Sequence, residues 1–103
     1  MKAVKVQYTV RSDYVELNKK NIQQVMSDLR EIDNPGVRYS AFLLEDRKTF
    51  IHLAMYPDEE TMSIVSDLTS FIVFRQQLKE SQPESPPKSE DLNLVASAFD
   101  FFG

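Results

Sequence analysis

The spacing of hydrophobic and polar residues predicts four strands and two helical regions along the chain. Apolar and polar residues alternate from about Ala3 to Val10, which is the two-residue period of a half-buried strand. After Ser12 the apolar residues recur at helical intervals on one face, and we expect this amphipathic helix to end near Asp33. The segment Asn34-Pro35-Gly36 then stops the helix, because proline disfavours helical backbone in the residue before it.

The stretch Val37–Tyr56 is the most regularly patterned part of the chain and predicts a β-hairpin around the polar turn Glu45–Lys48. A turn that is symmetric about Asp46 and Arg47 pairs Leu43 with Phe50, Ala41 with His52 and Tyr39 with Ala54. One face of the hairpin then carries Phe42, Leu44, Ile51, Leu53 and Met55, and the other carries Tyr39, Ala41, Leu43, Phe50, His52, Ala54 and Tyr56. Both faces are largely apolar, so both need a cover.

The second half of the chain predicts a helical region and a last strand. Proline followed by three carboxylates at Pro57–Glu60 is typical of a helix start, because negative charge is favourable at the positive end of the helix dipole. A second helical segment follows Thr69, with apolar residues on one face and polar ones on the other. We interpret the Pro/Ser-rich residues 81–91 as a loop. The last strand is expected from Leu92 to about Phe101.

The order of these elements, β-α-β-β-α-β, predicts an α+β protein with a ferredoxin-like fold, in which a four-stranded antiparallel sheet carries its helices on one face. We expect the helices to cover one set of side chains: Val4, Val6 and Tyr8 together with Ile51, Leu53 and Met55. The opposite face then carries Lys5, Gln7, Thr9, Tyr39, His52, Ala54 and Tyr56. A face with these aromatic residues is too apolar to be left to water, so we expect a homodimer with its two sheets face to face.

Composition narrows the class of protein. The chain has 103 residues, 42% of them hydrophobic, which suits one domain spanning residues 1–103. A net charge of −4 argues against nucleic-acid binding, and the basic residues are scarce in the second half, where residues 57–103 hold three against nine acidic ones. There is no cysteine, no signal-peptide pattern and no run of apolar residues long enough to span a membrane. We therefore expect a cytoplasmic protein with no membrane partner.

The element order, the strand Thr49–Leu53 and the late helix Phe71–Leu78 before a proline-bearing loop resemble the dimeric α+β barrel superfamily. Within it the chain is similar to the antibiotic-biosynthesis-monooxygenase-like domains, over nearly its whole length. The resemblance implies paired sheets and, in each subunit, a cavity for quinone-like or other small aromatic molecules. Some members are cofactor-independent oxygenases. Haem-degrading relatives use an Asn, a Trp and a His. This chain has no Trp, so that set of three residues cannot be transferred to it.

The resemblance directs attention to polar residues on the sheet. His52, the only histidine, is the candidate catalytic residue, as a base toward an acidic phenol or as a hydrogen-bond donor. The candidate ligand-binding residues are Tyr39, Tyr56, Tyr8, Asn21 and Arg38; Asn18 and Arg75 are further polar residues of the same kind. Each has a simpler interpretation as a core, interface or solvent-exposed side chain. No cofactor is expected, because two glycines cannot form a phosphate loop, and no metal, because ligands are too few.

Two functions are consistent with these features. The first is a small-molecule-binding or cofactor-independent monooxygenase-like protein that acts on a small aromatic or quinone-like compound. The second is a non-catalytic homodimeric domain in which His52 and the tyrosines belong to the interface or the core.

Overall fold

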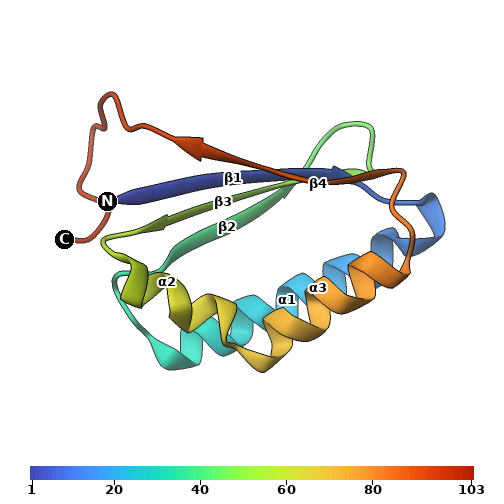
Figure 1. Cartoon of the computed structure of the whole chain (residues 1–103), viewed down its shortest axis with the longest axis horizontal. Coiled ribbons are helices and arrows are strands. Elements are labelled where there is room, and N and C mark those ends of the chain that lie inside the picture. Colours follow the sequence, from blue (N-terminus) through green and yellow to red (C-terminus); the bar gives the residue numbers. More distant parts are fainter.

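The computed structural model describes all 103 residues of the chain. Its elements are β1 (Lys2–Thr9), the short 3₁₀ helix η1 (Ser12–Tyr14), α1 (Val15–Ile32), β2 (Arg38–Leu43), β3 (Thr49–Tyr56), α2 (Glu59–Ser66), α3 (Thr69–Glu80) and β4 (Ser85–Leu92). The strands form one antiparallel sheet in the order β2-β3-β1-β4. The helices lie together on one side of the sheet (Figure 1). The predicted α+β, ferredoxin-like fold is confirmed.

The hairpin of β2 and β3 has the predicted register. Leu43 pairs with Phe50, Ala41 with His52 and Tyr39 with Ala54. The turn is fixed by Asp46, whose carboxylate accepts hydrogen bonds from the backbone N–H groups of Lys48 at 3.0 Å and Thr49 at 2.9 Å. Arg47 takes the left-handed backbone conformation with φ 64°. Local turn chemistry therefore determines which residues of the two strands face each other.

The prediction of which face the helices cover was half wrong. In the β1–β3 register Val6 pairs with His52 and Tyr8 with Phe50, so the His52 face of the hairpin is the one covered by the helices. Tyr8, Phe50, His52 and Tyr56 are all buried. The outer face instead carries the hairpin's other apolar set, with Lys5 opposite Leu53 and Gln7 opposite Ile51. His52 is therefore not a residue of the outer sheet face.

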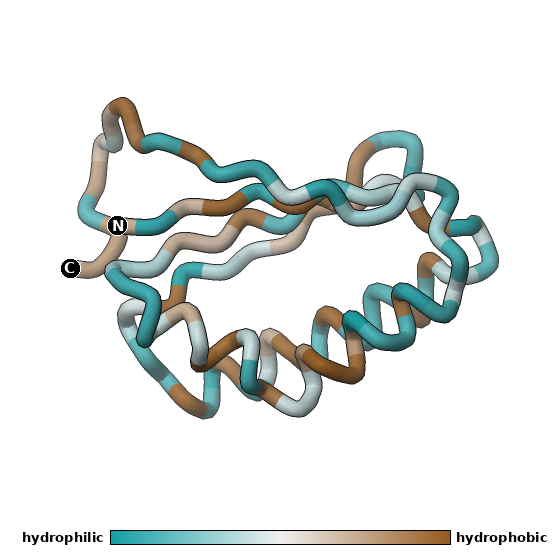
Figure 2. The backbone as a smooth tube through the Cα atoms, in the orientation of Figure 1, coloured by the Kyte–Doolittle hydropathy of each residue, from teal (hydrophilic) through white to brown (hydrophobic).

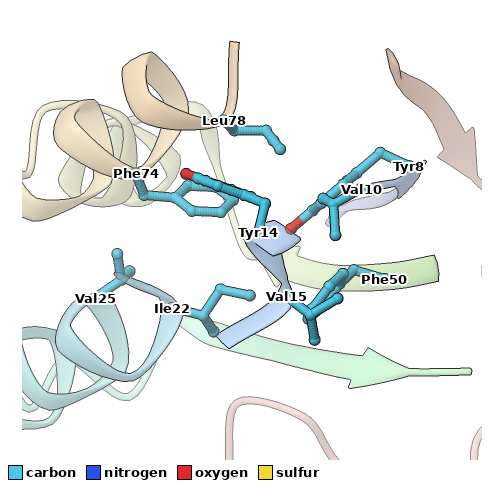
Figure 3. Packing of buried hydrophobic residues seen from close by; sticks show 9 residues of the cluster. All are labelled: Tyr8, Val10, Tyr14, Val15, Ile22, Val25, Phe50, Phe74 and Leu78. Atoms are coloured by element: carbon cyan, nitrogen blue, oxygen red, sulfur yellow. The ribbon is translucent and has the colours of Figure 1, made fainter. Parts of the chain in front are cut away.

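The hydrophobic core lies between the sheet and the two long helices. Figure 3 shows Ile22 and Val25 of α1 and Phe74 of α3 approaching Tyr8 and Phe50 of the sheet. The full cluster is Tyr8, Val10, Tyr14, Val15, Ile22, Val25, Phe50, Phe74 and Leu78. Fully burying a side chain of this size contributes about 1.5–3 kcal/mol to folding, so this interface holds the helices against the sheet.

The last strand lies earlier in the sequence than predicted. β4 spans Ser85–Leu92, inside the segment expected to be a loop, and the stretch predicted to be the strand follows it without regular structure. β4 pairs only with β1, at the edge of the sheet. Pro86 and Pro87 are tolerated because they lie at the irregularity where the β1–β4 register shifts, between the pairs Gln7–Lys88 and Thr9–Ser85. All of its residues are exposed, and Figure 2 shows β4 as more hydrophilic than β1 and β3.

The residues that follow β4 turn back along the end of the sheet where β1 begins (Figure 1). The Arg38 Nε donates a hydrogen bond of 2.5 Å to the backbone carbonyl of Phe101, which holds this segment against the start of β2. The rings of Phe99 and Phe101 meet edge to face with centroids 4.7 Å apart. None of the helices has the length and apolar character needed to cross a bilayer.

Candidate functional site

A chain of four hydrogen-bonded polar side chains runs through the space between the sheet and α1. The Asn18 Nδ2 donates to the Tyr8 hydroxyl at 2.9 Å, and that hydroxyl lies 2.8 Å from His52 Nε2. The other ring nitrogen of the histidine, Nδ1, lies 2.6 Å from the hydroxyl of Tyr39. Both nitrogens of His52 are thus occupied by tyrosines, and the four side chains act as one network.

The strand register brings the network together. His52 is at the middle of β3, paired with Val6 on one side and Ala41 on the other. Tyr8 and Tyr39 each lie two residues along the neighbouring strand from those partners, at the diagonal positions that long side chains reach on the same face. Asn18 comes from the buried face of α1 and is fully inaccessible to solvent.

The proton positions depend on the orientation of the Asn18 amide, and the following arrangement holds when its Nδ2 faces Tyr8. The Tyr8 hydroxyl accepts a hydrogen bond from the Asn18 amide, so its own proton is donated to His52 Nε2. A neutral imidazole carries one proton, which then sits on Nδ1 and is donated to the Tyr39 hydroxyl. The Tyr39 proton has no partner within the protein and is available to a molecule beside it.

Burial keeps every member of the network uncharged near neutral pH. Loss of solvent lowers the pKa of His52 from 6.5 to about 4, because the charged imidazolium is disfavoured away from water. Burial raises the pKa of both Tyr8 and Tyr39 well above their usual range for the same reason. The histidine is therefore neutral and the tyrosines are protonated, so the network offers hydrogen bonds and no fixed charge.

A cavity of about 910 Å³ opens beside the network. Its walls come from α3, from the helix-facing side of β1, β2 and β3, and from β4 with the segment that leads into it. It is lined by Val6, Tyr8, Tyr39, His52, Phe71, Ile72, Phe74, Arg75, Gln76, Leu78, Lys79, Pro83, Pro86, Pro87 and Ser89. The His52 ring stacks on Phe74 with centroids 5.4 Å apart and an interplanar angle of 27°. The volume and aromatic lining suit a planar organic molecule.

A second hollow of about 780 Å³ lies between α1 and β2, and it shares only Tyr39 with the network. Its lining includes Arg30, Asp33 and Arg38 and is more polar than the cavity beside His52. No aromatic ring other than that of Tyr39 faces it. The chemistry of the network is therefore directed to the cavity between α3 and the sheet.

The structure brings together three of the six site residues predicted from the sequence. Tyr8, Tyr39 and His52 share the network and the cavity. Tyr56 is buried on the same face but does not line the cavity, and burial raises its pKa to about 12. The Asn21 Nδ2 donates to Gln77 Oε1 at 2.7 Å and so connects α1 to α3. Arg38 lies outside the cavity and holds the C-terminal segment.

Asn18, rather than Asn21, is the asparagine that reaches the network. The signal was present in the sequence, since Asn18 falls on the buried stripe of the helix, three residues after Val15 and four before Ile22. A polar residue in an otherwise apolar stripe needs a buried partner. The Asn18 Oδ1 has none, so the amide could rotate to offer its oxygen to Tyr8. Phe71 and Phe74 of α3 also form part of the wall of the cavity.

Solved structures share this architecture. A candidate antibiotic biosynthesis monooxygenase from Bacteroides thetaiotaomicron superposes with a TM-score of 0.81 over 96% of this chain and 93% of its own, at 12% identity. Another from Nitrosomonas europaea gives 0.78 at 16% identity, covering 93% of this chain and 100% of its own. The chain has the antibiotic biosynthesis monooxygenase fold. This confirms the predicted resemblance.

A mutant of SnoaB, described as a cofactor-independent oxygenase from Streptomyces nogalater, has the same fold, with a TM-score of 0.71 and 11% identity over 96% of this chain and 97% of its own. No family model and no curated protein matches the sequence. At such low identity the structural likeness establishes the fold, and the chemistry has to be argued from the side chains of this chain.

Proposed function

We propose that the protein binds a small phenolic or quinone-like aromatic compound in the cavity beside His52 and oxygenates it without a cofactor. The observation that carries this proposal is the neutral chain Asn18–Tyr8–His52–Tyr39, which ends at the Tyr39 hydroxyl in a cavity with an aromatic wall. The likeness in fold to a cofactor-independent oxygenase supports the same reaction class.

Tyr39 is the residue that contacts the reacting oxygen in this proposal, and His52 positions it. Both imidazole nitrogens are already hydrogen-bonded to tyrosines, so neither is free for a ligand. Proton transfer from an ordinary phenol with a pKa near 10 to a histidine with a pKa of about 4 would cost about 8 kcal/mol. A hydrogen bond from Tyr39 to the phenol oxygen stabilises developing phenolate charge without that cost.

The network can serve a substrate and its oxidised product alike. In the arrangement described above, Tyr39 donates to a ligand oxygen. If the Asn18 amide rotates and accepts from Tyr8, all the hydrogen bonds reverse, and the Tyr39 oxygen can accept from a ligand hydroxyl while its own proton is donated to His52. A phenol requires an acceptor and a quinone requires a donor, so the same residue can hold both.

The reaction proposed is oxidation of a ring methylene next to a phenol. The methylene loses a proton to water, which reaches the open side of the cavity, and the electron-rich anion that remains transfers electrons to O₂. One oxygen atom enters the ring as a carbonyl and the other leaves as water, so the substrate supplies all four electrons.

Ligand binding is tested with 2-naphthol by isothermal titration calorimetry. Tyr39→Phe is expected to weaken binding by about fivefold, the value of one hydrogen bond. Tyr56→Phe is the matched control, because it removes the hydroxyl of a buried tyrosine on the same face that does not line the cavity. Circular dichroism verifies that both variants fold. Equal affinity for the wild type and Tyr39→Phe would contradict the assignment of Tyr39.

Oxygenation is tested with 1,8-dihydroxyanthrone, which has a methylene beside two phenols. We expect oxygen uptake above the uncatalysed rate, one atom of labelled O₂ in the quinone product, and a lower rate for Tyr39→Phe than for Tyr56→Phe. If 2-naphthol binds but no catalysed oxygen uptake is measured, the protein binds aromatic compounds without oxygenating them, and this reaction is excluded.

The non-catalytic alternative is supported by one observation. Every polar atom of His52 is satisfied within the protein, as expected of a core residue. In that case Tyr39→Phe and Tyr8→Phe lower the free energy of unfolding by about 1–3 kcal/mol each, and no aromatic compound raises the melting temperature.

We also propose a homodimer that pairs the outer faces of two sheets. Phe42 is 53% exposed there, and Ile51, Leu53 and Met55 lie beside it on the same face. Phe42→Lys is expected to give a monomer in light scattering at micromolar concentration, because it places charge in the apolar contact. Val73→Lys, at an exposed apolar position on α3, is the control and keeps the dimer. A monomeric wild type would exclude this assembly.

A further inference from the structure

The charge of the cavity is opposite to that of the chain. The protein contains sixteen acidic and twelve basic residues, but the cavity lining includes Arg75 and Lys79 and no Asp or Glu. These are two of the three basic residues in the acidic second half, residues 57–103. Positive charge is therefore concentrated at the one place where an aromatic ligand would lie.

Neither of these cations is neutralised within the protein. The ion pairs of the structure join Arg11 to Asp13, Lys19 to Glu16 and Lys48 to Glu84, and none of them includes Arg75 or Lys79. The nearest acidic residue along α3, Glu80, lies outside the cavity lining and accepts a hydrogen bond of 2.8 Å from Gln76. Arg75 and Lys79 are thus free to bind an anion.

The two cations stand side by side at the end of the aromatic wall. They are four residues apart on α3 and so lie on the same side of the helix. The Arg75 Cζ lies 5.8 Å from the centroid of the Phe71 ring, and Phe71 in turn lies 5.8 Å from Phe74, centroid to centroid. The aromatic surface that starts at His52 therefore leads directly to the guanidinium.

We infer that the ligand is an aromatic acid, with its ring between Phe74 and the prolines at the start of β4 and just before it, its phenol oxygen at Tyr39 and its carboxylate at Arg75 and Lys79. This inference rests on the proposed binding site. Arginine binds a carboxylate through two parallel N–H groups, and the stacked Phe71 ring limits how far the guanidinium moves. Pro83, Pro86 and Pro87 make the opposite wall rigid.

The test compares 6-hydroxy-2-naphthoic acid with its neutral amide, 6-hydroxy-2-naphthamide, by calorimetry. The two ligands share the ring and the phenol and differ in charge. Because Arg75 and Lys79 are exposed, each contributes modestly, and we expect the acid to bind about fivefold to tenfold tighter at low salt. The preference is expected to fall as sodium chloride is raised, because salt screens exposed charges.

The double variant Arg75→Gln with Lys79→Gln should bind acid and amide equally, while its affinity for the amide stays that of the wild type. Lys20→Gln, an exposed lysine of α1 outside the cavity, removes one charge elsewhere and keeps the preference. A preference for the acid that persists in the double variant, or an amide that binds as tightly as the acid to the wild type, overturns the inference while the binding site stands. If neither compound binds, the site itself is excluded.

Discussion

The buried histidine gives the fold a specific dependence on pH. In the folded chain burial lowers the pKa of His52 from 6.5 to about 4, whereas in the unfolded chain the ring is in water. The unfolded chain therefore takes up a proton at a higher pH than the folded chain does. The stability contributed by neutral His52 is complete above pH 6.5 and is lost as the pH falls toward 4.

The size of this effect follows from the two pKa values. Between a pH well above 6.5 and a pH well below 4, the free energy of unfolding falls by about 3 kcal/mol. Between about pH 7.5 and about pH 5.5 it falls by roughly 1.3 kcal/mol. This window stays above the isoelectric point of about 4.9, where the protein would tend to precipitate. Urea unfolding at the two pH values, at one protein concentration, gives the free energy of unfolding for comparison.

The matched control is His52→Gln, which has a donor and an acceptor but does not titrate. Carboxylates that titrate in this range contribute equally to both proteins and cancel in the difference. We expect the wild type to lose about 1.3 kcal/mol more than His52→Gln when the pH is lowered. Parallel pH dependence in the two proteins would show that His52 is not held neutral by burial and would refute the account of the network.

Two further substitutions test how the ends of the helices and strands are held. Asp58→Ala should lower the free energy of unfolding by about 1 kcal/mol, because the Asp58 carboxylate caps α2 by accepting a hydrogen bond from the backbone N–H of Thr61 at 2.8 Å. The control Asp67→Ala, at the other end of α2, should lower the free energy of unfolding by less. Equal decreases for the two variants in chemical denaturation would contradict the cap. Gly36→Ala should lower the free energy of unfolding by about 1–3 kcal/mol, because the added Cβ would lie 3.0 Å from a side-chain carbon of Thr61 and 3.2 Å from one of Pro57. An unchanged melting temperature would show that these neighbours move aside.

The hairpin register could be predicted from the sequence because its determinants are local. A short polar turn around Asp46 fixes which residues pair, and the two-residue period then sorts the side chains into two sets. The same local information did not say which set the helices cover. Both sets of the hairpin are apolar, and only the pairing of β1 with β3, between residues far apart in the sequence such as Val6 and His52, decides it.

The last strand was misplaced for a related reason. The residue pattern favours a loop for the proline-rich segment and a strand for the alternating residues after Leu92. Pro86 and Pro87 lie where the β1–β4 register shifts, so the pairing with β1 determines the strand and overrides the local preference.

The sequence by itself determined the order of elements, the ferredoxin-like fold and the hairpin that carries His52, because these follow from periodicity and turn chemistry over a few residues. Only the tertiary structure decided the site. Asn18, Tyr8 and Tyr39 come to His52 from three other elements, and the helix α3 brings Phe74 and Arg75 to the same cavity. These contacts depend on how the helices pack on the sheet, and a pattern over a few neighbouring residues does not specify contacts between residues that are far apart in the sequence.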